Sequence, residues 1–206
     1  VGLTLEPVDR CRDVDPHLRT AANGLRVLPS PARSAEAASA LREAGRHVVG
    51  TLAGTPSPVT IADVGRLPPD PGTHPFVAAA AATVIVHRQA TQSAAAAAVR
   101  LQRLADDVDA LAGTTSAPIV AVVGATPFAL DEIESFVGDV AGAVPVVGLP
   151  VDELAAAVLA GRSGVSAKRL ARLPLLKASR DLAAVAQRTV RALEDPPGRT
   201  AFGGAA

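Results

Sequence analysis

The apolar residues of this chain fall into short runs that alternate with longer segments of helical spacing. The runs at residues 59–62, 83–86 and 118–123 are almost wholly aliphatic, which is typical of strands buried on both faces of a sheet. A shorter run at residues 24–28 is stopped by a proline, and another covers residues 144–149. The pattern predicts a strand at each of these places.

The segments between the runs carry apolar residues at every third or fourth position, as one buried helix face requires. Hydroxyl and carboxyl side chains stand where such helices begin, and glycines or prolines stand where they end. The expected helices follow Ser34, follow Thr91 or Ser93 up to Gly113, cover 131–137 up to Gly138, cover 154–160 behind Asp152, and close the chain before Pro196.

Strands that alternate with helices, each strand apolar on both faces, predict an α/β fold with a mainly parallel sheet and helices on both faces. The chain of 206 residues is long enough for one large core. We expect one domain over residues 24–194, an irregular segment over 1–23 and a disordered tail over 195–206.

The amino-acid composition argues against several classes of binding partner. Lys and Arg total 20, as do Asp and Glu, so the net charge is zero and no bulk attraction to nucleic acid is expected. Aromatic residues make up 2% of the chain, too few for base stacking. One cysteine, no apolar run long enough to span a bilayer and no signal peptide predict a cytoplasmic protein without membrane insertion.

The run at residues 59–62 is followed by Asp63 and Gly65, which begin a Pro-rich loop. Ligands of parallel α/β sheets bind outside the carboxyl ends of the strands, so this carboxylate indicates nucleotide chemistry. The G-x-x-x-x-G-K-[ST] loop that would cradle the phosphates does not occur in the chain.

Together these landmarks resemble the MinD/ParA family of deviant P-loop ATPases, and within it the actinobacterial CpaE-like branch. The resemblance covers residues 24–193 and rests on the order of the landmarks more than on any one motif. The matching segments are residues 24–29, 59–65 (VTIADVG), 83–89, 118–124, 144–152 and 173–182.

The resemblance implies a P-loop NTPase-like, three-layer α/β/α fold, ATP and Mg²⁺ as cofactors, and a homodimer that nucleotide controls. Asp63 would hold the metal and Gly65 would offer a backbone N–H to the γ-phosphate, while Pro150 and Asp152 would border the base. The family acts in septum site determination, in cell division, and in pilus or secretion apparatus assembly. Protein partners from such an apparatus are therefore expected.

Two departures from the family pattern concern nucleotide binding. The family's first strand and its lysine-bearing phosphate loop would lie before residue 1, so we expect the fold to be incomplete at its N-terminus. Gly124 and Ala125 stand where many relatives have an asparagine that reads adenine. We therefore expect a regulatory protein without catalytic residues of its own. An ATPase whose phosphate loop is missing from this sequence is the alternative, and a flavodoxin-like binding domain is the weaker one.

Each candidate residue also has a structural interpretation. Asp63 can simply form a turn at a strand end, and Asp152 is a good helix cap. Arg66 is expected to be a solvated loop residue, and His87 a structural histidine at a strand end. Cys11 has no basic neighbour that would activate it.

Overall fold

The computed structural model describes residues 15–21, 24–31, 33–54, 59–66, 73–89, 93–112 and 117–194. The contacts divide the chain into two compact units, residues 1–80 and 81–206, and each is described by itself. The single domain expected over residues 24–194 spans both units and stays a prediction. The expected tail at 195–206 and most of the N-terminal segment lie outside the described residues.

The described residues of the first unit form a 3-10 helix, a short hairpin and two α-helices. A 3-10 helix covers Asp15–His17, and the strands β1 (Arg19–Thr20) and β2 (Arg26–Val27) pair antiparallel. The helices are α1 (Ser34–Gly54) and α2 (His74–Ala79). The strand expected over residues 24–28 therefore exists only at Arg26–Val27, and it belongs to an exposed hairpin instead of a parallel sheet.

The strand expected over residues 59–62 is wrong. Residues 59–65 are without regular secondary structure, and Val59 and Ile61 are 70% and 89% exposed. An apolar run is buried as a strand only when a neighbouring strand satisfies its backbone and helices cover its faces. Neither condition is met for this segment in the described part of the chain.

The second unit is built on a three-stranded parallel sheet in the order β3-β4-β5. The strands are β3 (Ala82–Arg88), β4 (Ala117–Val123) and β5 (Val146–Leu149). Each covers most of an apolar run that the sequence pattern assigned to a strand. The α/β class and the parallel pairing are confirmed for this unit.

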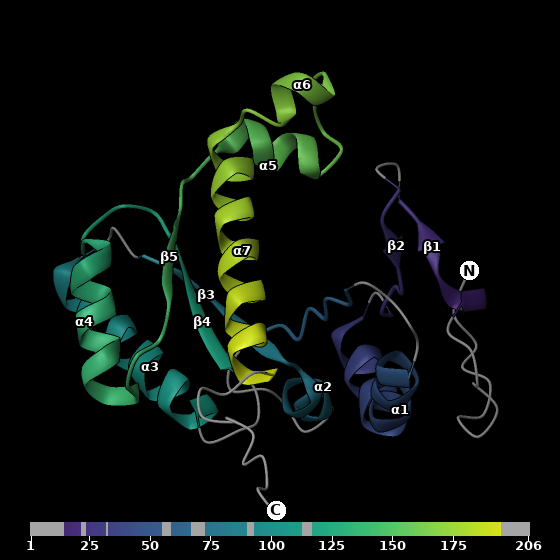
Figure 1. Cartoon of the computed structure of the whole chain (residues 1–206). Coiled ribbons are helices and arrows are strands. Elements are labelled where there is room, and N and C mark those ends of the chain that lie inside the picture. Colours follow the sequence, from purple (N-terminus) through teal and green to yellow (C-terminus); the bar gives the residue numbers. More distant parts are fainter. Residues whose placement is uncertain are drawn as a thin grey trace, which may run out of the picture. The chain divides into compact units, whose positions relative to one another are not determined.

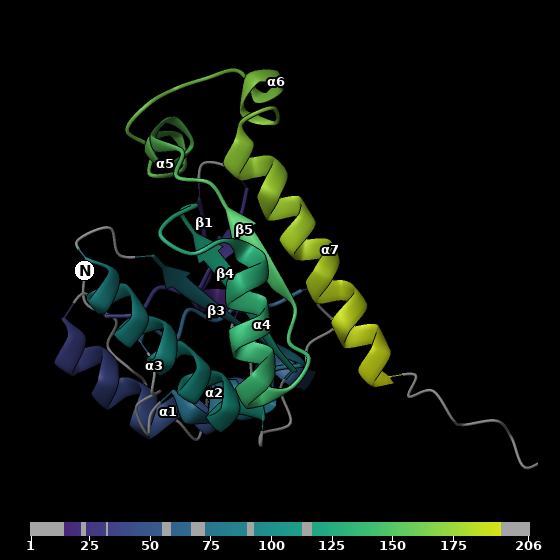
Figure 2. The same ribbon diagram turned by 90° about the vertical axis from the view of Figure 1, so that its left-hand side faces the viewer.

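Helices cover both faces of this sheet (Figure 1). The helix α3 (Ala94–Ala112) joins β3 to β4, and α4 (Leu130–Ala141) joins β4 to β5. Right-handed crossovers that advance in one direction place both helices on the same face, and α3 packs against α4. The last helix, α7 (Pro174–Glu194), contacts all three strands, and Figure 2 shows the strands between α3 and α7.

The core of the second unit is concentrated under α3 and α4. The largest fully buried side chains belong to β4, α3 and α4: Ile119, Ile133, Val108, Val120, Val122 and Val137. The other face is covered less completely, because α7 has no fully buried side chain among its described ones. On β3, Ile85 is 7% exposed while Val86, which points to the opposite face, is 65% exposed.

The helix ends agree with the sequence pattern in part. Ser93 caps α3 by accepting a hydrogen bond from the Ala96 N–H at 3.1 Å, as expected. The end expected at Gly138 is wrong, because α4 continues to Ala141 and stops at Gly142, whose φ is +78°. Gly142 takes up a left-handed conformation that favours glycine, whereas Gly138 tolerates the helix. The short helices α5 (Glu153–Leu159) and α6 (Ala167–Leu170) precede α7.

Candidate functional site at the carboxyl edge of the sheet

The carboxyl ends of β3, β4 and β5 are joined by backbone hydrogen bonds that continue the sheet beyond its strands. The Gln89 N–H donates to the Val123 carbonyl at 3.1 Å, and the Gly124 N–H donates to the Leu149 carbonyl at 3.1 Å. Gly124 has a φ of +95°, which turns the chain sharply after β4. Backbone hydrogen bonds therefore join the strand ends at the edge where ligands of parallel sheets bind.

Gln89 fastens the loop between β4 and α4 to this edge. Its side-chain amide donates to the carbonyls of Gly124 at 3.1 Å and Phe128 at 2.9 Å, and its carbonyl accepts from the Phe128 N–H at 2.9 Å. Gln89 is 7% exposed. Because both amide hydrogens and the amide oxygen are engaged, this side chain braces the loop instead of facing a ligand.

Asp152 joins the starts of two helices. One carboxylate oxygen accepts from the Ala155 N–H at 2.9 Å, which caps α5. The other oxygen accepts from the Leu175 N–H at 3.4 Å, in the first turn of α7. The expected helix cap is thus observed, with a second helix added to it. Pro150, the other residue expected to border a base, is exposed.

Asp63 and Gly65 lie in the first unit, on the exposed segment at residues 59–66. The Gly65 N–H donates to a carboxylate oxygen of Asp63 at 3.0 Å, and Gly65 has a φ of +77°. This is an Asx turn, the structural interpretation of the pair. A γ-phosphate would have to replace Asp63 as the partner of the Gly65 N–H. Arg66 is exposed, as a solvated loop arginine is.

His87 and Arg88 occupy the end of β3. His87 is half-buried, and its pKa lies below the usual 6.5 because burial disfavours the charged ring and the positive charge of Arg100 repels it. Arg88 is exposed. The exposed polar side chains described at the strand ends include Arg88 and Thr126, which can hydrogen-bond an anion. Cys11 lies outside the described residues.

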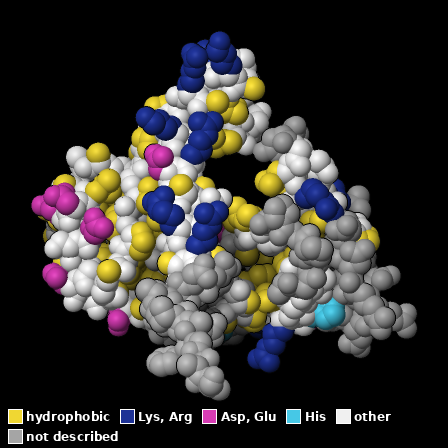
Figure 3. Space-filling model, viewed as in Figure 1, with side chains coloured by type: hydrophobic (Ala, Val, Ile, Leu, Met, Phe, Trp, Pro, Cys, Tyr) yellow, Lys and Arg dark blue, Asp and Glu magenta, His cyan; other side chains and the backbone are white. Residues whose placement is uncertain are grey.

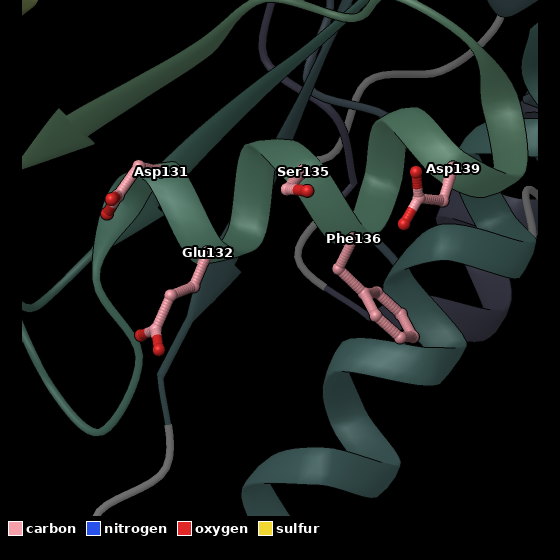
Figure 4. Close-up of a pocket in the computed structure, with 5 residues that line it drawn as sticks. All are labelled: Asp131, Glu132, Ser135, Phe136 and Asp139. Carbon is pink, nitrogen blue, oxygen red and sulfur yellow. The ribbon is translucent and has the colours of Figure 1, made fainter.

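The described residues contain no group of three or more His, Cys, Asp or Glu side chains placed to hold a metal ion. A Mg²⁺ ion at Asp63 would need phosphate oxygens and waters as its other ligands, which is a common arrangement for this ion. A shallow depression elsewhere in the second unit is lined by α4 alone, through Asp131, Glu132, Ser135, Phe136 and Asp139 (Figure 4).

Sequence reasoning did not identify Gln89 as a bracing residue. Its partners stand 35 and 39 positions further along the chain, so no local pattern marks them. The available signal was a polar side chain directly after a strand that is otherwise mostly apolar. Asp152 was found because its first partner is three residues away, whereas the contact with Leu175 spans 23.

No protein-family model, curated protein or solved structure matches the chain significantly. Among the described residues, no helix combines the length and the apolar character needed to cross a bilayer.

Proposed function

We propose that this chain is a regulatory or positioning protein of the MinD/ParA kind, with a P-loop NTPase-like, three-layer α/β/α fold. It acts in the cytoplasm through protein contacts, in septum placement or in assembly of a pilus or secretion apparatus. One observation carries the non-catalytic part of this proposal. At the carboxyl edge of the sheet, the side chains of Gln89 and Asp152 form hydrogen bonds with the chain's own backbone.

Sites for chemistry usually hold several polar groups that converge on free space. Here Gln89 holds the loop after β4, and Asp152 holds the starts of α5 and α7. Both side chains stabilise the loops at the edge where this class of fold binds its ligands. Rigid loops of this kind suit a surface that a partner protein reads.

The second candidate is an ATPase that binds Mg²⁺ and ATP when a phosphate loop is supplied. Asp63 favours it, because this exposed carboxylate stands two residues before Gly65, which has no side chain and whose φ of +77° is one that glycine adopts readily. Such a carboxylate can hold Mg²⁺ together with phosphate oxygens. Pro150 and Asp152 would then border the base, and a nucleotide-controlled homodimer would be the active state. A flavodoxin-like binding domain is a weaker candidate.

Titration calorimetry with Mg²⁺ and ATP separates the two main candidates. We expect no binding heat for the chain of residues 1–206, and the same for the Asp63→Asn and Asp109→Asn variants. Asp109 is an exposed carboxylate on α3 and serves as the control. Binding by the wild-type and Asp109→Asn chains that is lost in Asp63→Asn would establish the ATPase candidate and overturn the non-catalytic one.

The positioning role is tested in dividing actinobacterial cells that express the chain fused to a fluorescent protein. We expect foci at septa or cell poles, with the fluorescent protein alone spread evenly as the control. An even distribution of the fusion through the cell cycle, at a level where the fusion is intact, would contradict the positioning role.

A further inference from the structure

In the second unit the segment from α6 to α7 is mostly basic and α4 is acidic, while α3 carries both signs, including the exposed Arg100 and Arg103, and α7 ends at Glu194. Residues 161–193 contain one acidic side chain, Asp181, and eight exposed basic ones: Arg162, Lys168, Arg169, Arg172, Lys177, Arg180, Arg188 and Arg191. We call these eight the basic surface. Figure 3 shows basic side chains gathered over α6 and α7 and acidic ones over α4. Within the described part of the chain, none of the eight forms an ion pair.

The α4 helix carries the opposite charge. Asp131, Glu132, Glu134 and Asp139 are all exposed, and the helix has no basic residue. We call these four the acidic surface. Asp131, Glu132 and Asp139 lie on the side of α4 away from its buried residues Ile133 and Val137, whereas Glu134 lies on the flank of the helix.

These two surfaces cannot neutralise each other within one molecule, because β5 lies between α4 and α7 (Figure 1). The net charge of the whole chain is zero. Two copies therefore do not repel each other at long range, and the acidic surface of one copy can face the basic surface of another.

The spacing of the charges also matches. Asp131 and Asp139 are eight residues apart on α4, and Arg180 and Arg188 are eight residues apart on α7. At 1.5 Å per residue, both pairs span about 12 Å along their helices. Arg180 also donates to the Ala171 carbonyl at 3.1 Å, which fixes its position beside α6.

The acidic surface includes a place for an arginine. The carboxylates of Asp131, Glu132 and Asp139 are spread along the shallow depression on α4, with the ring of Phe136 toward the Asp139 end (Figure 4), and Glu132 also accepts from the Ala129 N–H at 2.7 Å. Carboxylates accept the N–H groups of a guanidinium in pairs, and an aromatic ring attracts its positive charge. Six of the eight residues of the basic surface are arginines.

From these observations we propose that α7 of one copy binds α4 of a second copy, in a head-to-tail contact. Such a contact leaves α4 free on one copy and α7 free on the other, so that further copies can add. The inference rests on charge and helix spacing alone and does not depend on the proposed function.

Sedimentation of the full chain tests this contact. We expect the average mass to rise with protein concentration at about 50 mM salt and to return to that of a monomer at about 0.5 M salt, because salt screens exposed charges. The variant R180E/R188E reverses the basic surface, and D131R/D139R reverses the acidic one. Each alone is expected to weaken self-association by about tenfold or more.

A mixture of these two variants tests directly whether the acidic and basic surfaces bind each other. In the mixture the acidic α4 of the first fits the basic α7 of the second, and the reversed α7 of the first fits the reversed α4 of the second, so mixing should restore an association that neither variant shows alone. The control variant R42E/R46E changes the same number of charges at exposed positions on α1 and should associate like the wild type. Because Asp131 stands in the first turn of α4, the single variant D139R serves as a second acidic-surface variant if D131R/D139R unfolds.

Three results would overturn the proposal. One is a chain that stays monomeric at low salt up to about 1 mM, where contacts worth only about 4 kcal/mol are detected. Another is a variant mixture that does not pair. The third is a monomeric chain that binds a DNA duplex or anionic phospholipid vesicles through Arg180 and Arg188, since this would assign the basic surface to a different polyanion.

Discussion

The side-chain amide of Gln89 and the backbone of Phe128 form a reciprocal pair of hydrogen bonds, each 2.9 Å long. This pair links the end of β3 to the loop that leads into α4. The same side chain also reaches the Gly124 carbonyl, so one residue supports the loop at two points. The loop at the candidate ligand edge depends on this contact.

Replacing Gln89 by alanine should therefore destabilise the second unit. The change leaves an N–H and two carbonyls without their partner, and each buried group left unsatisfied costs about 1–3 kcal/mol. We expect the free energy of unfolding to fall by about 2–4 kcal/mol in urea denaturation. The control is Gln102→Ala, since Gln102 is exposed on α3 and bonds only to Asp106 among the described contacts. A loss as small as that of the control would contradict the bracing role.

Asp152 should stabilise two helices at once. Asp152→Ala removes the cap of α5 and the bond to Leu175, and we expect a loss of about 1–2 kcal/mol. Asp152→Asn should lose less, because its amide oxygen can still cap α5 while its NH₂ group cannot accept from the Leu175 N–H. Thermal melts that rank wild type, Asn and Ala in this order would support the double cap. Equal melts for Asn and wild type would show that the bond to Leu175 contributes nothing.

His87 should make the second unit less stable in mild acid. Because its folded-state pKa is lowered from 6.5, the unfolded chain binds more protons between the two values. The contribution of the neutral ring is then complete above about pH 6.5 and is lost as the pH falls through the folded pKa. Urea denaturation across this range should show a slope that His87→Gln reduces. His74→Gln, at an exposed position on α2, should leave the slope unchanged.

The two faces of β3 should respond differently to truncation. Ile85 is 7% exposed and packs in the core, so Ile85→Ala should cost about 2–5 kcal/mol. Val86 is 65% exposed, and Val86→Ala should change stability by about 0.5 kcal/mol or less. Denaturant midpoints of the two variants provide the comparison. Similar losses at both positions would mean that the outer face of β3 is covered in solution.

Local pattern alone identified much of the second unit. The helical spacing of Leu101, Leu104 and Val108 predicted the buried face of α3, and all three are buried. The aliphatic run of β4 predicted a strand buried on both faces. Ser93 and Asp152 were recognised as caps because each bonds to an N–H three residues away. Short-range geometry of this kind is set by neighbours in the chain.

The apolar run at residues 59–62 shows where such reasoning stops. Its composition is that of a buried strand, yet Ile61 is 89% exposed and the segment has no regular secondary structure. Asp63 and Gly65 consequently form an exposed turn whose part in nucleotide binding stays a proposal. The apolar composition of a segment indicates that its burial would be favourable. It does not determine whether a neighbouring strand is present to pair with that segment.

The sequence by itself determined the α/β class, the strands of the second unit and the helix caps, because these depend on side-chain periodicity and on hydrogen bonds between near neighbours. Tertiary structure decided the rest. Gln89 acquired its role from Phe128, 39 residues away, and Asp152 its second helix from Leu175, 23 residues away. The opposed charges of α4 and α7 became separate surfaces only when the sheet came between them. Such relationships join residues distant in the chain, so the folded arrangement alone creates them.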